Sequence, residues 1–248
     1  MTMKKKLFTS GIVLAVMLLL FLVYWYYLAK PGSLPTNEEL IAEINEIYPQ
    51  ARADVIQDTI SIDEKHVLVP FVSTNEEYGL SYLVWEKHKW KVVNIDTKGY
   101  PMLWKIEKNN PDSYYLVWNI QPSDQLQYID FYMTRDRGFR ISYGTEHYYY
   151  PKVQMVQRVN AQEKTYGAMA LPDEWQSFMS SLMKVEEASQ PQSLFYEMPI
   201  GQSIRIGFIP YDKNDKITEL EGSINGSSYT IGDIQLDFVL HLYEEDLE

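Results

Sequence analysis

Hydrophobic and polar residues follow three patterns along this chain, and the longest is a continuous apolar run. The 23 residues Leu7–Ala29 carry no charged side chain, and they come directly after Lys4, Lys5 and Lys6. At about 1.5 Å of rise per residue, such a helix is about 35 Å long, enough to cross the roughly 30 Å hydrocarbon core of a bilayer. Trp25 and the tyrosines beside it would form an aromatic belt at the far interface. The run therefore predicts a transmembrane helix.

A cleaved signal peptide has the same basic start and apolar centre. Two features favour an uncleaved anchor. The run is longer than the roughly 7–15 apolar residues of a signal peptide, and cleavage after Ala29 would need a small residue where the chain has Tyr27. Basic flanks stay in the cytoplasm, so we expect a single-pass cell-membrane protein with a cytoplasmic N-terminus and residues 30–248 outside the cytoplasm.

The second pattern is helical spacing, which occurs in two segments of the outer part. Thr36 and Glu39 form a capping box at the start of the first segment, which Pro49 ends. The second segment begins at Pro172 and has acidic residues in its first turn. The apolar stripes are Leu40, Ile41, Ile44 and Ile47 in the first segment, and Trp175, Phe178, Met179, Leu182 and Met183 in the second. These stripes predict two amphipathic helices that bury one face each.

The third pattern is a series of short runs of β-branched and aromatic residues separated by polar breaks. Residues 53–96 read as an antiparallel meander with turns at 63–65, 74–79 and 87–89. Pro70 lies inside one of these strands and favours a strand at a sheet edge or a bulge. Asn225 and Gly226 predict a hairpin turn near the C-terminus. The fold class is therefore α+β: an N-terminal transmembrane helix, then mainly antiparallel sheet with two amphipathic helices.

Shifts in composition suggest how the chain is organised. Residues 1–6 form a basic cytoplasmic tail, 7–29 the transmembrane helix and 30–35 a tether rich in Pro, Gly and Ser. We expect a small α+β domain of one helix and the meander at 36–98, and a second, β-rich α+β domain at 99–248. The sequence "TKGYP", residues 97–101, marks the boundary. Whether the two units are separate domains or one is left open.

Charge narrows the classes of partner. The whole chain has a net charge of −12, and the part after the three N-terminal lysines has 19 basic against 34 acidic residues, a net charge of −15. Such a surface repels polyanions, which argues against a nucleic-acid partner. The expected partners are the lipid bilayer, through Leu7–Ala29, and another envelope protein; homo-oligomerisation is left open. The chain has no cysteine, so thiol catalysis, disulfides and cysteine-ligated metals are excluded.

Local motifs for catalysis or cofactor binding are missing from the sequence. The four histidines lie in different segments, without the spacing of a zinc site. A calcium-binding loop that starts at Asp212 would need other residues at its fifth, sixth and twelfth positions, which are Lys216, Ile217 and Ser223. Neither a nucleophile elbow nor a phosphate-binding glycine loop occurs. We therefore expect no catalytic residues, no metal site and no cofactor, and a protein that is not an enzyme.

The sequence "YGTEHYYYPK", residues 143–152, is the candidate ligand-binding segment because it places a carboxylate and an imidazole among tyrosines. Its candidate residues are Glu146, His147, Tyr148 and Tyr150. The alternative is a β-strand that begins at Glu146 after a turn. Tyr148 and Tyr150 would then point to one face of a sheet, and Tyr149 to the other.

Taken together, these features predict a non-enzymatic interaction or sensing module of the bacterial envelope, anchored by one helix. Its layout of basic start, single anchor and cysteine-free outer part resembles that of single-span proteins of Gram-positive bacteria. An anchored carbohydrate- or peptide-binding protein is the first alternative, since aromatic faces stack on sugar rings; the candidate side chains are Trp85, Trp90, Trp104, Trp118 and Trp175 beside Tyr148, Tyr149 and Tyr150. An anchored hydrolase is the second.

Overall fold

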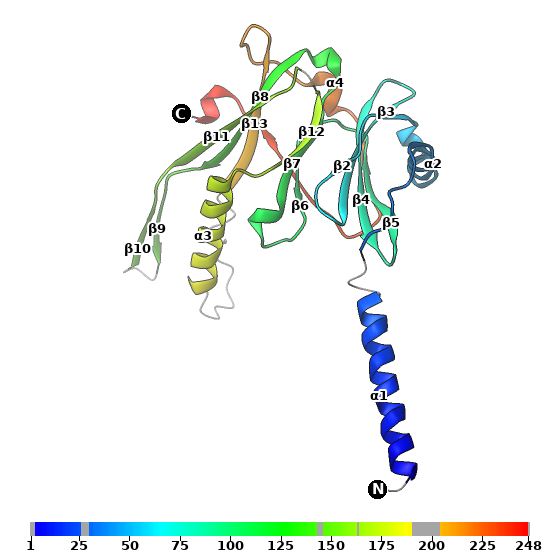
Figure 1. Ribbon diagram of the computed structural model, residues 1–248. Coiled ribbons are helices and arrows are strands. Elements are labelled where there is room, and N and C mark those ends of the chain that lie inside the picture. The colour runs from blue at the N-terminus through cyan, green and yellow to red at the C-terminus, as the bar shows by residue number, and fades with distance from the viewer. Residues whose placement is uncertain (1–2, 26–29, 143–145, 163, 190–203, 248) are drawn as a thin grey trace.

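The computed structural model describes the backbone of residues 3–25, 30–142, 146–162, 164–189 and 204–247, and it is a mixed α+β fold in which nearly all strand pairs are antiparallel (Figure 1). The α-helices of these ranges are α1 (Met3–Val23), α2 (Asn37–Ile47), α3 (Asp173–Ser189) and the one-turn α4 (Glu221–Ile224). This confirms the predicted α+β class and the two amphipathic helices of the outer part.

The strands form three larger sheets and one two-stranded ribbon. Sheet A has the order β1 (Ala53–Ile56), β3 (His66–Ser73), β4 (Tyr78–Glu86), β5 (Lys89–Asp96) and β14 (Ser228–Thr230), with β2 (Ile60–Ser61) also paired to β3. Sheet B has the order β12 (Tyr166–Ala170), β7 (Tyr114–Asn119), β6 (Met102–Lys105) and β15 (Gln235–Phe238). Sheet C has the order β11 (Val153–Asn160), β8 (Leu126–Arg135), β13 (Ile204–Asp212) and β16 (Leu240–His241), and the ribbon pairs β9 (Gly138–Ser142) with β10 (Glu146–Tyr150).

Sheet B is the central layer, because its two faces pack against different sheets (Figure 1). Side chains alternate between the faces of a strand. On β7, Val117 therefore packs with Leu68 and Tyr82 of sheet A, whereas the neighbouring Leu116 packs with Phe131 of sheet C. The packing connects sheets A and B into one core and sheets B and C into another.

Helix α2 covers the outer face of sheet A and agrees with its predicted pattern. The Thr36 hydroxyl accepts a hydrogen bond from the Glu39 backbone N–H at 3.3 Å, and the Glu39 carboxylate accepts one from the Thr36 backbone N–H at 2.8 Å. Leu40 and Ile44 are fully buried against sheet A. The capping box sets where the helix begins, and the apolar stripe sets which face it buries.

The edge position predicted from Pro70 is wrong, because β3 lies inside sheet A between β4 on one side and β1 and β2 on the other. The Pro70 carbonyl points to the side of β1 and β2, where it accepts a hydrogen bond from the backbone N–H of Gln57 at 2.9 Å. The proline nitrogen points to the same side, towards the gap between the end of β1 and the start of β2. The gap between two short strands removes the need for the N–H that proline lacks.

The C-terminal segment joins sheets A and B and departs from its predicted structure. The expected hairpin around Asn225 is wrong: the residues before it form α4, and the strand after it, β14, pairs with β5 across more than 130 residues of sequence. β15 then pairs with β6 of sheet B. Strand pairing therefore links residues on both sides of the predicted boundary at 97–101, while the division into two domains stays a prediction.

The turn between β5 and β6 shows why a glycine is needed at the boundary. A Cβ atom at Gly99 would lie 1.7 Å from the carbonyl oxygen of Asn119, so no larger residue fits. The Asn119 side-chain amide donates to the carbonyl of Gly79 at 2.7 Å and to that of Phe71 at 3.2 Å. One buried amide thus ties the end of β7 to two strands of sheet A.

Helix α3 packs against sheets B and C with the predicted residues, since Trp175 and Met179 are buried in the core that contains Phe131. Helix α1 extends away from the rest of the molecule (Figure 1), and its described side chains, Ser10 to Leu22, are exposed. Within the described part of the chain, no helix combines the length and the apolar character needed to cross a membrane.

Candidate functional site

The candidate ligand-binding segment contains strand β10. This strand begins at Glu146, as the alternative interpretation expected. His147 lies opposite Ile141 of β9, and Tyr149 lies opposite Phe139. The side chains of Glu146, His147, Tyr148 and Tyr150 lie outside the described residues, so their role in ligand binding stays a prediction. The Tyr149 side chain is described, and it is exposed.

Three of the five tryptophans proposed as sugar platforms are buried. Trp104, Trp118 and Trp175 are each no more than 4% exposed, so their faces are used in core packing. Trp85 and Trp90 lie at the tip of the β4–β5 hairpin. The described residues contain no group of three or more His, Asp or Glu side chains able to hold a metal ion. The loop after β13 is closed by Asp212, whose carboxylate accepts the backbone N–H groups of Asn214 and Lys216.

A different site lies between sheets A and B, beside their late strands β14 and β15. There β5 and β14 of sheet A face β6 and β15 of sheet B across a pocket of about 180 Å³. The residues that line it are Asn94, Asp96, Lys98, Met102, Ser228, Thr230, Ile234, Leu236 and Phe238. Its floor is buried, because Asn94 and Asp96 are at most 3% exposed, and its rim at Ser228, Thr230 and Phe238 is exposed. We call it the Asp96 pocket.

The carboxylate of Asp96 is the unusual group of this pocket. Its Oδ1 accepts a hydrogen bond from the backbone N–H of Lys98 at 2.8 Å, and none of the ion pairs among the described residues includes Asp96. Burial raises the pKa of Asp96 to about 6, and the hydrogen bond and charge of Lys98 offset only part of that increase. Burial disfavours a charged carboxylate that has no partner cation. A cation that enters the pocket would therefore stabilise the charged form of Asp96.

Next to Asp96, hydrogen bonds connect the side chains of Asn94, Ser228 and Thr230. The Asn94 amide donates to the hydroxyl of Thr230 at 2.7 Å and to that of Ser228 at 3.1 Å. These bonds join β5 to β14 and hold Asn94 on the pocket floor. They form a rigid polar wall, since both hydroxyls come from a strand that is itself paired to β5.

Tyr82 lies below this wall, directly opposite Asn94 in the β4–β5 pairing. Its ring packs edge-on against Trp104, with ring centroids 5.0 Å apart. Its hydroxyl is buried and has no hydrogen-bond partner within the described structure. Burial, and secondarily the charge of Asp96, raise the pKa of Tyr82 well above its usual value, so the hydroxyl stays neutral.

The other wall of the pocket is apolar. Met102, Leu236 and Phe238 come from sheet B, and Phe238 is 69% exposed at the rim. The Lys98 ammonium lies over the Phe238 ring, 5.9 Å from its centroid. An apolar wall above a buried carboxylate suits a group with an aliphatic stem and a cationic end, because each part then meets a matching environment.

The sequence patterns do not predict this site. Asp96 ends a predicted strand at a predicted turn, a position that usually carries a solvated acid. The one available signal is the sequence "NID", in which the polar Asn94 and Asp96 occupy the same face of a strand whose neighbours are apolar. That pattern does not reveal which face is buried, since the covering strands β14 and β15 lie more than 130 residues further along the chain.

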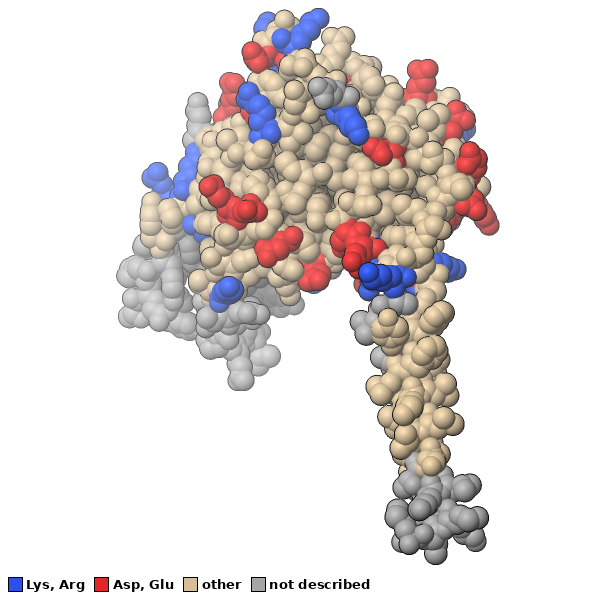
Figure 2. Space-filling model, in the orientation of Figure 1, with Lys and Arg blue, Asp and Glu red and all other residues tan. Residues whose placement is uncertain are grey.

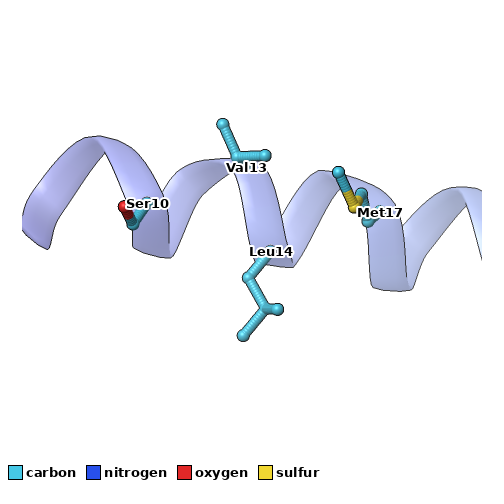
Figure 3. A pocket seen from close by; sticks show the side chains of 4 residues that line it. All are labelled: Ser10, Val13, Leu14 and Met17. Atoms are coloured by element: carbon cyan, nitrogen blue, oxygen red, sulfur yellow. The ribbon is translucent and has the colours of Figure 1, made fainter.

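A shallow depression on α1 is lined by Ser10, Val13, Leu14 and Met17 (Figure 3). In this view Val13 and Met17 point to one side of the helix and Leu14 to the other. All four residues belong to one helix, so the depression has no opposite wall and provides no enclosed site.

No protein-family model, no curated protein and no solved structure matches this chain.

Proposed function

We propose that this chain is a single-pass membrane protein whose outer part is a non-enzymatic interaction module, and that the Asp96 pocket binds a basic side chain of another envelope protein. The observation that carries the binding proposal is the buried Asp96 carboxylate on the floor of a pocket of about 180 Å³. Sites for drug-sized ligands are usually about 300–1,000 Å³. A pocket this small suits one Lys or Arg side chain of a larger partner.

The anchor is supported by the chemistry of the N-terminal segment. Residues 7–29 carry no charge, and large apolar side chains from Ile12 to Leu22 are about half exposed or more in α1. A helix that is apolar on all sides and covered by no other element needs an apolar environment. The lysines at positions 4–6 orient the segment with residues 30–248 outside the cytoplasm.

Binding fits the pocket better than catalysis does. The polar groups beside Asp96 are an amide and two hydroxyls that hydrogen-bond to one another, and the Tyr82 phenol is kept neutral. General acid–base chemistry needs a group that exchanges protons with the reacting atom. Asp96 alone fits that description among these residues, and its charge is the feature that a cation would recognise.

A topology experiment tests the anchor. The chain has no cysteine, so a single one can be introduced without background. We expect Asn75→Cys to react with a membrane-impermeant maleimide in intact cells, and Lys5→Cys to react only after the cells are opened. The reverse labelling pattern, or a protein that leaves the membrane at alkaline pH, would contradict the anchor.

A ligand titration tests the pocket. The probes are n-butylammonium and n-butylguanidinium, with n-butanol as the neutral control, and binding is followed by NMR of the full chain in detergent micelles. We expect both cations to shift the signals of Ser228 and Thr230 at pH 8 and to lose affinity as the pH falls below about 6, where Asp96 takes up a proton. Asp96→Asn should abolish the response. Equal shifts with n-butanol would contradict the proposal.

The partner is then sought in membranes of the source cells. A photoreactive amino acid in place of the exposed Phe238 is expected to form one protein adduct that is lost in Asp96→Asn. An adduct that forms equally well in both variants would show that the partner does not use the pocket.

A further inference from the structure

The tip of the β4–β5 hairpin has a composition and a position that the Asp96 pocket does not explain. Its sequence is "WEKHKWK", residues 85–91, and it lies beside one end of α1 (Figure 1). We define the hairpin tip as Trp85 through Lys91. It contains three lysines in a chain whose net charge is −12.

Specific contacts hold the hairpin tip against the end of α1 and the tether. The ring of Trp25 stacks on His88, with centroids 5.1 Å apart. The Trp90 indole N–H donates to the carbonyl of Gly32 at 3.1 Å. The Trp85 ring covers Gly32 so closely that a Cβ there would lie 3.3 Å from it. The tip therefore lies beside Trp25 and the tether residue Gly32.

The lysines of the tip are placed to meet a surface outside the molecule. Lys87 and Lys89 are exposed, as is Lys30 on the tether. Glu86, the acidic residue of the tip, is paired with Lys91 at 3.0 Å, so it does not neutralise the other two lysines. In Figure 2, blue side chains lie where the helix meets the body, with red ones beside them, and both colours also occur over the rest of the same face.

The backbone of the tip supports a role for these particular side chains. Lys87 has a φ of 51° and His88 a φ of 62°, so both turn residues are in the left-handed region. A two-residue hairpin turn of this type favours Asn and Gly, which adopt the conformation at lower cost. The chain instead keeps a lysine and an imidazole at the turn, a local strain that points to a use for the side chains.

We propose that the hairpin tip docks on the headgroups of anionic lipids beside the anchor. This inference rests on the membrane anchor of the proposed function. Trp85 and Trp90 have the amphipathic rings typical of the interfacial region, and Lys87 and Lys89 bind lipid phosphates. Together with the tether contacts, docking fixes the orientation of the outer part relative to the membrane. The acidic charge of the remaining surface is repelled by the same lipids, which makes that orientation selective.

The test uses the full chain with Trp25→Phe, reconstituted in lipid nanodiscs that contain a lipid with a nitroxide on its headgroup. Trp85 and Trp90 are then the tryptophans open to the quencher, because the other three are at most 4% exposed. Discs of phosphatidylcholine are compared with discs that contain phosphatidylglycerol. We expect stronger quenching in the anionic discs, reversed by 0.5 M salt.

The decisive variant adds Lys87→Gln and Lys89→Gln. Each lysine near an anionic surface changes the ratio of docked to undocked protein by about fivefold, so this pair should lower it by about 25-fold. The matched control is Lys213→Gln with Lys216→Gln, two exposed lysines in the loop after β13, at the end of the molecule opposite α1 (Figure 1). The control should quench like the parent protein.

The outcomes separate this inference from the anchor. Protein that enters the discs but is quenched equally with and without Lys87 and Lys89 would overturn the docking of the tip and leave the anchor standing. Protein that does not enter discs of either composition would overturn both. A second variant, Lys87→Asn with His88→Gly, relieves the strain of the turn; retained folding with reduced quenching would show that the side chains, and not the turn, make the contact.

Discussion

Asp96 and Asp130 are two carboxylates of nearly equal burial, 3% and 4% exposed, in opposite electrostatic surroundings. Asp130 of β8 faces Arg158 of β11 in the strand pairing, and the guanidinium donates to both carboxylate oxygens at 2.7 Å. The same guanidinium lies 3.8 Å from the centroid of the Tyr128 ring. Asp96 has a single backbone N–H donor and a raised pKa.

The difference separates a structural carboxylate from a candidate binding group. The hydrogen bonds to Asp130 raise the pKa of Arg158 above its usual value, so each charge stabilises the other. Asp96 has no such partner within the described chain, and its burial costs stability at neutral pH. A buried charge that lowers stability is retained more easily when it serves a function.

The largest expected effect comes from Asp96→Asn. Its pKa is about 6 in the folded chain and 3.8 as a free side chain, so folding favours the protonated form. The contribution of Asp96 to the free energy of unfolding is thus complete below pH 4 and is lost as the pH rises through 6, a change of about 3 kcal/mol. We expect Asp96→Asn to be about 3 kcal/mol more stable than the parent in urea at pH 8, with little difference at pH 4.

Asp124→Asn is the matched control, because Asp124 is also buried but accepts the hydroxyl of Ser223 at 2.7 Å and the backbone N–H of Gly222 at 3.0 Å. Its loss should destabilise the chain at pH 8. Stabilisation by both substitutions, or by neither, would remove the distinction drawn for Asp96.

The second effect is the loss of the cation at the other site. Arg158→Met leaves the Asp130 carboxylate buried without its partner, which should lower the free energy of unfolding by about 2 kcal/mol. The effect is not larger because the arginine side chain is 59% exposed, so water can replace part of the lost interaction. Adding Asp130→Asn should recover part of that loss. A double-mutant cycle in urea measures the coupling energy between Arg158 and Asp130. A coupling energy near zero would show that Asp130, like Asp96, has no stabilising partner cation.

Lys98→Met tests the weaker cation of the Asp96 pocket. The charge of Lys98 lowers the pKa of Asp96, so its removal should raise that pKa further above 6. The lysine is partly exposed, and we expect a change in stability of less than about 1 kcal/mol. An NMR titration of the Asp96 carboxyl carbon follows the pKa. A lower pKa in the variant would contradict the assigned role of Lys98.

The smallest effect is expected for Tyr82→Phe. The Tyr82 hydroxyl is buried and lacks a hydrogen-bond partner among the described residues, so its removal deletes an unsatisfied group and no bond. The stability should change by less than about 0.5 kcal/mol or increase. A loss of more than about 1 kcal/mol in urea would reveal a hydrogen-bond partner for the hydroxyl, such as a buried water.

Local sequence patterns predicted an element correctly where residues close together in the sequence make the contacts that define it. The capping box of Thr36 and Glu39 and the stripe of Leu40 and Ile44 define α2 within eleven residues. The meander of sheet A was predicted for the same reason, since consecutive strands pair through short turns. Pro70 shows the limit: its cost depends on whether a strand lies beside it, and the gap between β1 and β2 is a property of the sheet.

The amino-acid sequence by itself determined the apolar N-terminal segment, the two amphipathic helices, the strand-rich α+β class and the acidic charge. Each of these follows from composition or from a period shorter than one element. Only the tertiary structure decided that Asp96 is buried, because β14 and β15 return from the far end of the chain to cover it. Only the tertiary structure brought the hairpin tip to Trp25 and Gly32. A site made from distant segments depends on how whole sheets pack, which the spacing of neighbouring residues does not encode.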